Sequence, residues 1–307
     1  MGKILITGAS GFIGKELLKN ENFRNSIVIG RSKPLDCNHF IHFDFNLDTN
    51  YSKLFKNIDY VIHLAGLAHL PNKNNNSNLS KFSLLNTKVT SKLAYHASKS
   101  NVKKFIYISS IKVLGEFTEQ NVSFNNLSPY KPKDNYAISK VDAEKSLIKI
   151  SKDSKMKYVI IRPPLVYGPK VKGNLHTLKK IIDKGFYLPF GSFKNKRSYV
   201  SVNNLIDLIH TCLIKSEANN KIFLISDGKD LMTSEFISAV SIALKNSSRV
   251  FSFPKILLKI ILYLVGKGHL YHKLDESLII DHSYTVNTLN WFPKYDIHNE
   301  IKRCFKN

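Results

Sequence analysis

The sequence has few cysteines and lacks a long apolar run. Its three cysteines, Cys37, Cys212 and Cys304, are scattered through 307 residues without a Cys-x-x-Cys spacing. This pattern excludes a disulfide framework and predicts no metal site. The longest apolar run, Ile256–Val265, contains Lys259 and is too short to span a bilayer. The N-terminus enters an apolar run without a secretory leader, so we expect a reduced, cytoplasmic protein with no transmembrane segment.

Negative charge is also scarce, because 46 Lys and Arg residues face 23 Asp and Glu residues and give a formal net charge of +23. Nucleic-acid surfaces concentrate positive charge and combine it with arginine and aromatic side chains. Here only six of the basic residues are arginine, and lysine is spread over nearly every segment. We therefore expect no nucleic-acid partner, and a weakly basic surface that attracts anionic substrates.

The apolar runs alternate with helical patterns, which is typical of an α/β fold. We predict a doubly wound parallel (Rossmann) sheet in an NAD(P)-binding domain, residues 1–165, and a smaller C-terminal substrate-binding lobe, residues 166–307. A strand near 221–226 is expected to return from the lobe to the main sheet. The other predicted strands are 4–6, 26–30, 40–43, 60–64, 105–108 and 158–161. The predicted helices are 81–100, 135–150, 174–184, 204–215, 233–244, 255–265 and 296–305.

The first strand leads into a glycine-rich turn, TGASGFIG, with glycines at Gly8, Gly11 and Gly14. In a dinucleotide-binding turn, one glycine allows the chain to turn, the next lets backbone approach a pyrophosphate, and the third allows close packing of helix on strand. The helix that starts near Phe12-Ile13 would offer its free N–H groups to the anion. The alternative is a tight strand-to-helix turn that binds no ligand.

The second predicted strand ends at Arg31, where no acid is present. In dinucleotide folds an acid at this place holds the ribose 2′-OH of NAD, and an arginine accommodates the 2′-phosphate of NADP. Arg31 therefore favours NADP(H) over NAD(H). The alternative is that Arg31 is a solvated loop cation.

Tyr136 and Lys140 are four residues apart on a predicted helix and thus share one face. A neighbouring ammonium would lower the pKa of the Tyr136 phenol, so that it can exchange the proton that accompanies hydride transfer. Ser110 follows the fifth strand, at the edge of the sheet where ligands bind, and could hydrogen-bond the same substrate oxygen. We predict that Ser110, Tyr136 and Lys140 are catalytic.

Taken together, these motifs resemble the extended short-chain dehydrogenase/reductases, also described as the NAD-dependent epimerase/dehydratase family. TGASGFIG resembles their cofactor turn, HLAG their fourth-strand motif, Tyr-x-x-x-Lys their catalytic pair and RPPLVYGP their motif after the sixth strand. The resemblance implies that Asp44 and Phe45 border the adenine and that Lys140 also holds the nicotinamide ribose. The complete set of cofactor contacts that it implies is Gly8, Gly11, Phe12, Ile13, Gly14, Arg31, Asp44, Phe45, Leu64, Ala65, Gly66, Asn86, Tyr136, Lys140 and Pro163.

Within the family, the chain looks like members that act on UDP-linked sugars. This likeness implies substrate contacts from Ser110, Lys112, Asn174 and Arg197. For Arg197 there is a separate physical reason, since a planar guanidinium suits phosphate oxygens; the alternative is a surface arginine among lysines. Leu165 departs from the family, many of whose members carry Asn there, which leaves part of the pyrophosphate contact unassigned.

Three reactions are weighed on this resemblance. The favoured one is NAD(P)-dependent reduction at C4 of a UDP-linked 4-keto-6-deoxy-N-acetylhexosamine for polysaccharide or O-antigen precursors, and the alternative is a UDP-hexose 4-epimerase of the UDP-glucose or UDP-N-acetylglucosamine type. Dehydration is disfavoured, because Ile111 and Lys112 stand where the dehydratases carry Asp and Glu. A non-catalytic NADP-binding sensor is disfavoured by the presence of both Tyr136 and Lys140.

Two further expectations concern the outer surface. The apolar helix at 255–265 is expected to pack in the core of the smaller lobe, with a membrane or a glycosyltransferase as the alternative contact of its Leu/Ile face. The family resemblance also implies a possible homodimer formed through a pair of helices.

Overall fold

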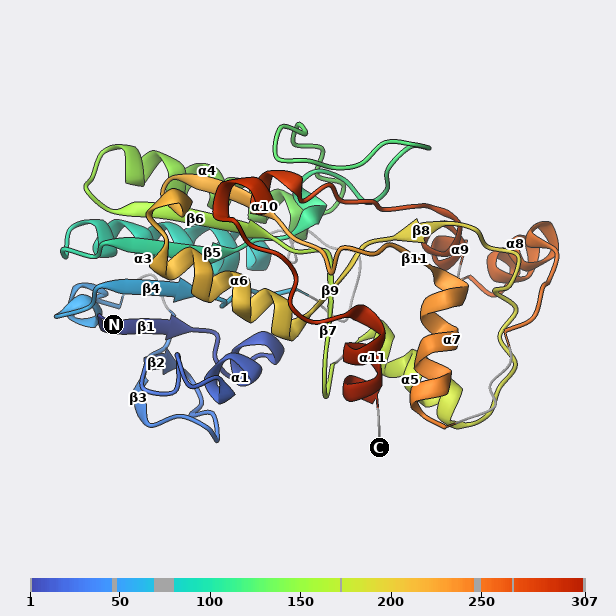
Figure 1. The fold of residues 1–307 in the computed structure, drawn as a ribbon. Coiled ribbons are helices and arrows are strands. Elements are labelled where there is room, and N and C mark those ends of the chain that lie inside the picture. The colour runs from blue at the N-terminus through green and yellow to red at the C-terminus, as the bar shows by residue number, and fades with distance from the viewer. Residues whose placement is uncertain are drawn as a thin grey trace.

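The computed structural model describes residues 2–45, 49–68, 80–171, 173–245, 250–266 and 268–305. Its centre is a sheet of seven strands in the order β10-β6-β5-β4-β1-β2-β3 (Figure 1). Every neighbouring pair runs parallel, and the order reverses between β1 and β4, so the sheet is a doubly wound Rossmann sheet, as predicted. The strands are β1 (Ile4–Thr7), β2 (Ile27–Gly30), β3 (His39–His42), β4 (Tyr60–His63), β5 (Lys104–Ile108), β6 (Lys157–Arg162) and β10 (Lys221–Leu224).

The central strands are short runs of Ile, Val, Leu and Phe, which suit a parallel sheet that is buried on both faces. All residues of β1 and β5 are buried. Each strand lies within two residues of the bounds predicted from the sequence. β10 lies late in the chain and pairs with β6 from Lys221↔Val159 to Leu224↔Arg162.

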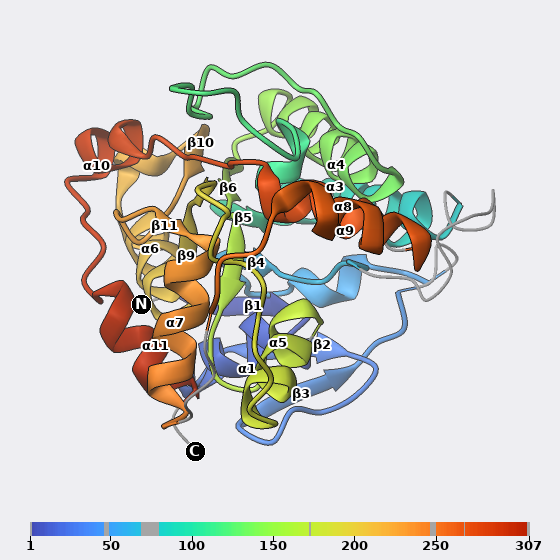
Figure 2. The same cartoon turned by 90° about the vertical axis from the view of Figure 1, so that its right-hand side faces the viewer.

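Helices cover both faces of the sheet (Figures 1 and 2). On one face, α1 (Phe12–Lys19) and α6 (Val202–Ile214) contribute to a single apolar cluster. On the other, α3 (Val89–Ser98) and α4 (Asn135–Lys152) pack against each other and the strands. Because α6 and β10 belong to this layered unit, the segment after residue 165 is interleaved with the sheet, and the domain boundary stays a prediction.

The remaining segments form smaller apolar clusters beyond the carboxyl ends of the strands. Two small pairs, β7–β9 and β8–β11, connect them to the sheet, and the sequence analysis did not predict these pairs or α9 and α10. The elements of this region are β7 (Leu165–Tyr167), α5 (Asn174–Asp183), β8 (Lys196–Arg197), β9 (Tyr199–Ser201), β11 (Leu231–Met232), α7 (Thr233–Ala243), α8 (Lys255–Leu264), α9 (Gly268–Asp275) and α11 (Ile297–Phe305). The remaining helix, α10 (Ser283–Leu289), packs against β10 in the layered unit.

The expectation that the helix at 255–265 packs in the core of the lobe is wrong for most of its length. In α8 only Leu258 is buried, with 7% of its surface exposed, while Leu264 is 81% exposed. The apolar pattern predicted burial, but the segments that pack against α8 reach only one side of it.

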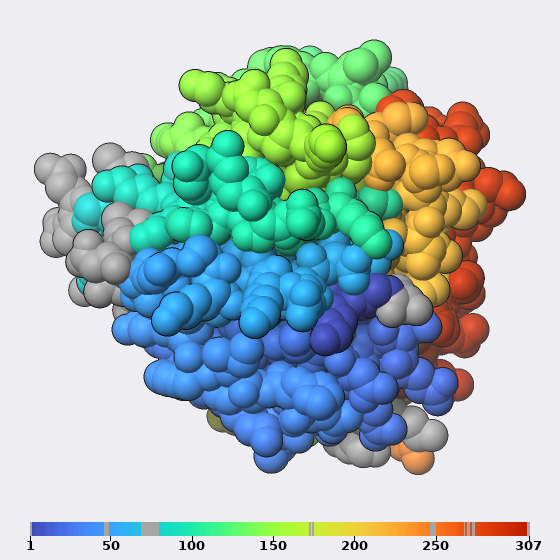
Figure 3. Space-filling model, turned by 90° about the vertical axis from the view of Figure 1, so that its left-hand side faces the viewer, coloured from blue at the N-terminus to red at the C-terminus, as the bar shows by residue number. Residues whose placement is uncertain are grey.

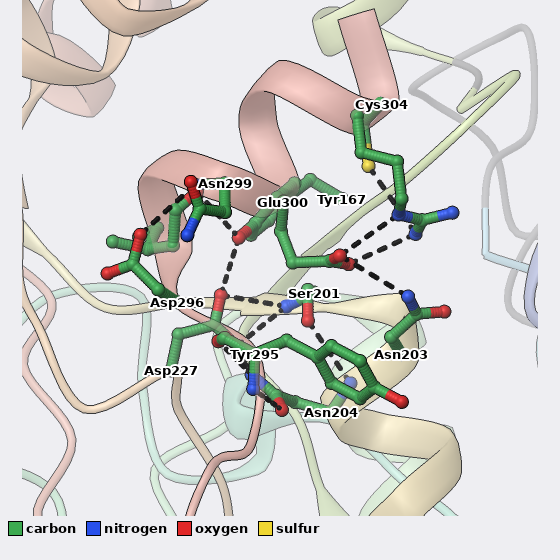
Figure 4. Close-up of polar contacts among 12 residues, drawn as sticks. Tyr167, Ser201, Asn203, Asn204, Asp227, Tyr295, Asp296, Asn299, Glu300 and Cys304 are labelled. Carbon is green, nitrogen blue, oxygen red and sulfur yellow. Dashed lines mark hydrogen bonds and ion pairs between the residues drawn. The ribbon is translucent and has the colours of Figure 1, made fainter.

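A buried polar cluster joins the segment before α11 to β7, β9 and α6 (Figure 4). Asp227 accepts hydrogen bonds from the Tyr167 hydroxyl at 2.7 Å, from the Ser201 amide at 2.9 Å and from the Asn204 side chain at 2.7 Å. Asn204 also exchanges two hydrogen bonds with the backbone of Tyr295, just before α11. Burial raises the pKa of Asp227 to about 6, against the lowering effect of these donors.

Candidate active site

The glycine turn adopts the geometry predicted for two of its three glycines. Gly8 has φ +74°, and a Cβ there would lie 2.4 Å from the Ala65 amide nitrogen. A Cβ on Gly14 would lie 2.4 Å from Cα of Ala9, so this glycine allows the close packing of α1 on the turn. Gly11 is exposed and its missing Cβ would meet only the Gly8 carbonyl, at 3.1 Å. Its predicted role, close approach of a pyrophosphate, stays a prediction.

The start of α1 fits a bound anion. Gly11 is the N-cap residue and no side chain caps the helix, so its first N–H groups are not engaged by a capping side chain. Phe12 and Ile13 are half-buried in the first turn. The Phe12 ring lies 2.9 Å from the position of a Cβ on Gly168, which brings the RPPLVYGP segment against the turn.

The turn after β4 lies directly beside the glycine turn. The Leu64 amide donates to the Thr7 carbonyl at 3.1 Å, and the Ala65 amide donates to the Thr7 hydroxyl at 3.3 Å. A Cβ on Gly66 would lie 3.1 Å from Asn86 Oδ1 and 3.4 Å from Lys140 Nζ. Four separate stretches of the chain therefore meet at this edge of the sheet.

Asn86 organises the next part of the site from a π-helical turn, Ser83–Lys88. Its amide group accepts from the Leu67 N–H at 2.7 Å and donates to the Leu67 carbonyl at 3.0 Å and to the Ser139 hydroxyl at 3.0 Å. π-Helical turns widen a helix locally and are frequent at functional sites. Asn86 thus ties the turn after β4 to α4, the helix that carries Tyr136 and Lys140.

Ser110 lies near Tyr136 and lowers the pKa of its phenol. The catalytic roles predicted for the two residues stay a prediction. Ser110 follows β5, while Tyr136 lies in the first turn of α4, whose N-terminus is capped by Asp134 through a 2.7 Å bond to the Ala137 amide. Burial raises the pKa of Tyr136 to about 12, and the hydrogen bond with Ser110 and the charge of Lys112 lower it only in part. The prediction that this pKa is lowered is therefore wrong for the chain's own side chains.

The reason lies in the position of Lys140. Its ammonium donates to the Ile108 carbonyl at 2.9 Å and lies 4.6 Å from the centre of the Tyr107 ring, but 5.9 Å from the centre of the Tyr136 ring. Burial lowers the pKa of Lys140 to about 8, and the carboxylate of Glu144 raises it in part. Lys140 is thus a buried, readily titrated cation close to Gly66 and the two turns.

The residues predicted to meet the adenosine end lie at the carboxyl ends of neighbouring strands. Arg31 directly follows β2 and is exposed, while Asp44 and Phe45 follow β3. β2 and β3 pair in parallel, so these residues lie at the same edge of the sheet. Pro163, predicted from the RPPLVYGP motif, is buried after β6, and its carbonyl accepts from the Ile111 amide at 2.9 Å.

Of the residues predicted to contact the substrate, Lys112 and Arg197 are held by neighbouring groups of the chain. Lys112 forms ion pairs with Glu116 at 3.0 Å and with Asp134 at 2.7 Å, so its charge is largely compensated. Arg197 donates to the Glu276 carbonyl at 3.1 Å, and the charge of Glu116 also acts on it. Asn174 begins α5, and its side chain lies outside the described part of the structure.

A buried group behind Lys140 was not predicted from the sequence. Arg162 makes two bonds to Glu144, at 3.1 Å and 2.6 Å, and the Tyr130 hydroxyl donates to Glu144 at 2.8 Å. Glu144 lies four residues after Lys140 on the buried face of α4. An acid at that spacing on an apolar face was the available signal, because a buried carboxylate requires a partner.

The opposite side of the molecule, at the amino ends of the strands, faces the viewer in Figure 3. Two hollows there, of about 610 and 700 Å³, are lined by residues at the amino ends of the strands such as Tyr60, Lys103 and Lys157. Neither lining includes a predicted site residue. The predicted site residues lie instead toward the carboxyl ends of the strands. Open α/β sheets bind their ligands at this edge.

Comparison with known proteins agrees with this geometry. The model of the NAD-dependent epimerase/dehydratase family matches residues 4–226. The UDP-glucose 4-epimerase of Vibrio cholerae is 39% identical over 98% of this chain and 93% of its own length. Among solved structures, UDP-glucose 4-epimerase of Thermotoga maritima with UDP-glucose has a TM-score of 0.80 at 21% identity, covering 99% of this chain and 97% of the other. UDP-glucuronic acid 4-epimerase of Bacillus cereus with NAD has a TM-score of 0.78 at 21% identity and the same coverage.

The two structural neighbours support the fold, whereas the family match and the V. cholerae relative span most of the sequence itself. This chain, with its glycine turn and its buried Lys140 on the helix that carries Tyr136, belongs to the NAD-dependent epimerase/dehydratase family of enzymes.

Proposed function

We propose that the enzyme oxidises and reduces C4 of a hexose carried on UDP, and that epimerisation at C4 is the net reaction. The observation that carries the proposal is the placement of Ser110 and Tyr136 beside the buried Lys140, at the edge where the two turns meet. The V. cholerae relative, which matches nearly the whole chain, is named as a UDP-glucose 4-epimerase. This supports epimerisation over the reduction that the sequence alone favoured.

In the proposed mechanism, Tyr136 exchanges a proton with the C4 oxygen while Ser110 hydrogen-bonds the same oxygen. A bound nicotinamide would supply the hydride acceptor and donor and, when oxidised, a positive charge that favours the Tyr136 phenolate. Lys140, whose ammonium lies 5.9 Å from the centre of the Tyr136 ring, would hold the ribose. Net epimerisation requires that hydride return to the opposite face of the 4-keto sugar. Tyr136 would take the proton from the C4 oxygen in the first half-reaction and give it back in the second.

Dehydration does not fit this site. Ile111 is 3% exposed and has no titratable group, and the Lys112 ammonium is held by Glu116 and Asp134. An elimination of water needs an acid and a base next to the sugar. These two positions supply neither.

The second candidate is an NADPH-dependent reductase of a UDP-linked 4-keto sugar, and Arg31 favours it. Arg31 is exposed at the end of β2, where it can meet a 2′-phosphate. We therefore keep the proposal that the enzyme prefers NADP(H) to NAD(H), although the B. cereus structure was solved with NAD. A reductase consumes one reduced cofactor per product, whereas an epimerase regenerates it.

One experiment separates the two reactions. The purified enzyme is incubated with UDP-glucose, UDP-N-acetylglucosamine and a UDP-4-keto-6-deoxy-N-acetylhexosamine, each with NADH, with NADPH and without added cofactor, and the products are identified by NMR. Interconversion of C4 epimers without loss of nicotinamide absorbance supports epimerisation. Stoichiometric loss of absorbance with the keto sugar supports reduction, and no reaction at C4 of any of these sugars contradicts both.

A further inference from the structure

Helix α8 presents a wide apolar face to solvent. Five aliphatic side chains recur at the spacing of one helix face, and each is about half exposed or more. We call them the α8 face: Ile256 (74% exposed), Leu257 (49%), Ile260 (51%), Ile261 (47%) and Leu264 (81%). A monomeric protein rarely leaves such a continuous apolar surface uncovered. The arrangement marks an interaction surface.

The segment that precedes α8 in the chain also exposes an aromatic side chain. Phe251 is exposed, and its backbone is hydrogen-bonded to Leu188 and Gly191, which places the segment 186–191 beside it. The exposed rings of Phe186 and Tyr187 belong to that segment. In Figures 1 and 2, α8 lies at the end of the molecule opposite the N-terminus, on the outer side of the lobe. A broad, flat partner can therefore reach it.

All charged residues within α8 are basic. α8 contains Lys255 and Lys259 and no acidic residue. Lys259 is exposed and lies 5.6 Å from the centre of the Tyr271 ring, while Lys255 is paired with Asp275. The whole chain carries a formal net charge of +23. An exposed apolar helix face on a basic protein, with an exposed lysine on the same helix, is typical of helices that lie in a membrane surface.

We propose that the α8 face docks the enzyme on an anionic membrane surface, with α8 lying in the plane of the lipid headgroups. Its ten residues are too few to cross a bilayer, and no helix in the described part of the chain is long and apolar enough to do so. A second copy of the chain is a poorer partner, because it would bring the same lysines and the same positive net charge to the contact. Anionic headgroups complement that charge while the acyl region takes up the aliphatic side chains.

Sedimentation with lipid vesicles tests the proposal on the full chain. Vesicles of phosphatidylcholine alone are compared with vesicles that also contain phosphatidylglycerol, at moderate salt. We expect the anionic vesicles to carry down at least tenfold more protein than the neutral ones. The double variant Ile260→Ser/Leu264→Ser should reduce this binding at least tenfold, while Leu127→Ser, which alters an 85% exposed leucine in the loop before α4, should bind like the natural sequence.

Three results would overturn the proposal. The first is equal vesicle binding by the double variant and the natural chain, which would show non-specific attraction of a basic protein. The second is no binding to anionic vesicles. The third is a concentration-dependent dimer, seen by analytical ultracentrifugation without lipid, that the double variant abolishes, since the α8 face would then belong to a second copy. Unchanged circular dichroism and thermal unfolding of the variant show that it has folded.

Discussion

At the residue scale, the proposed chemistry depends on the phenol of Tyr136. We expect Tyr136→Phe to lower turnover roughly 10²- to 10⁴-fold, the usual contribution of a positioned proton-transfer group. Cofactor binding, measured by fluorescence titration, should change little, because Phe keeps the ring. Tyr95→Phe, which alters a 51% exposed tyrosine on α3, is the matched control and should keep full activity. Retained turnover in Tyr136→Phe would reject the assignment.

Lys140 gives the proposed reaction a pH dependence. Burial lowers its pKa to about 8, so the ammonium predominates below that pH and is lost above it. If the ammonium is required, kcat/KM should fall as pH rises through about 8, since this ratio reports groups of the free enzyme.

Lys140→Arg provides the control for this pH profile, because arginine stays charged throughout the range. We expect the variant to have lower activity, since the guanidinium does not fit the contact with Ile108, but to lose the fall near pH 8. An unchanged alkaline fall in Lys140→Arg would assign that fall to another group.

The sequence predicted where the candidate catalytic residues lie, but not how burial shifts their pKa values. Ser110 directly follows β5 and Tyr136 lies at the start of α4, as their motifs indicated. The raised pKa of Tyr136 did not, because it depends on burial, which only the folded chain defines. Likewise, helical spacing placed Lys140 near Tyr136, but the Ile108 carbonyl that binds its ammonium comes from a different element.

At the element scale, the turn between β1 and α1 requires glycine at Gly8. An alanine there would combine a strained φ of +74° with a Cβ 2.4 Å from the Ala65 nitrogen. We expect Gly8→Ala to lower the free energy of unfolding by about 2 to 4 kcal/mol in urea denaturation. It should also weaken cofactor binding, since the two turns must move apart.

Gly30→Ala is the matched control, because nothing lies within 4 Å of the added Cβ. It should leave the stability unchanged or raise it by about 0.5 kcal/mol. If the two substitutions changed the free energy of unfolding equally, the loss at Gly8 would be a general effect of the added methyl group. It would then not result from the close approach of the glycine turn to the turn after β4.

Element prediction was accurate where a pattern is local. The apolar runs of the seven sheet strands and the helical spacing of α4 are visible in the sequence itself. The two-residue strands β8 and β11 were missed, because such short pairings depend on neighbours far away in the chain. The prediction that α8 is buried was wrong for a similar reason. An apolar face shows that a helix needs a partner, but not that this chain supplies the partner.

At the scale of the whole molecule, the order of strands decides which residues gather at the active edge. Alternating strands and helices were enough to predict the doubly wound sheet, since few topologies satisfy that pattern. The Glu144–Arg162 pair and the Asp227 cluster were not predicted, because each joins segments that are close only in the folded chain. The homodimer and the cytoplasmic location remain predictions.

The Asp227 cluster should make the stability of the whole molecule depend on pH. In the folded chain the pKa of Asp227 is about 6, above its ordinary value of 3.8. Protonation of Asp227 therefore stabilises the fold below about pH 4, and this stabilisation is lost as pH rises through 6. A pKa difference of about two between the folded and unfolded chain corresponds to about 3 kcal/mol of unfolding free energy. Urea denaturation from pH 4 to 7 should therefore show the unfolding free energy of the natural chain falling by about this amount relative to Asp227→Asn, which does not titrate. A difference between the two proteins that stays constant over this range would mean that Asp227 is ionised throughout, and that Tyr167, Ser201 and Asn204 fully compensate its burial.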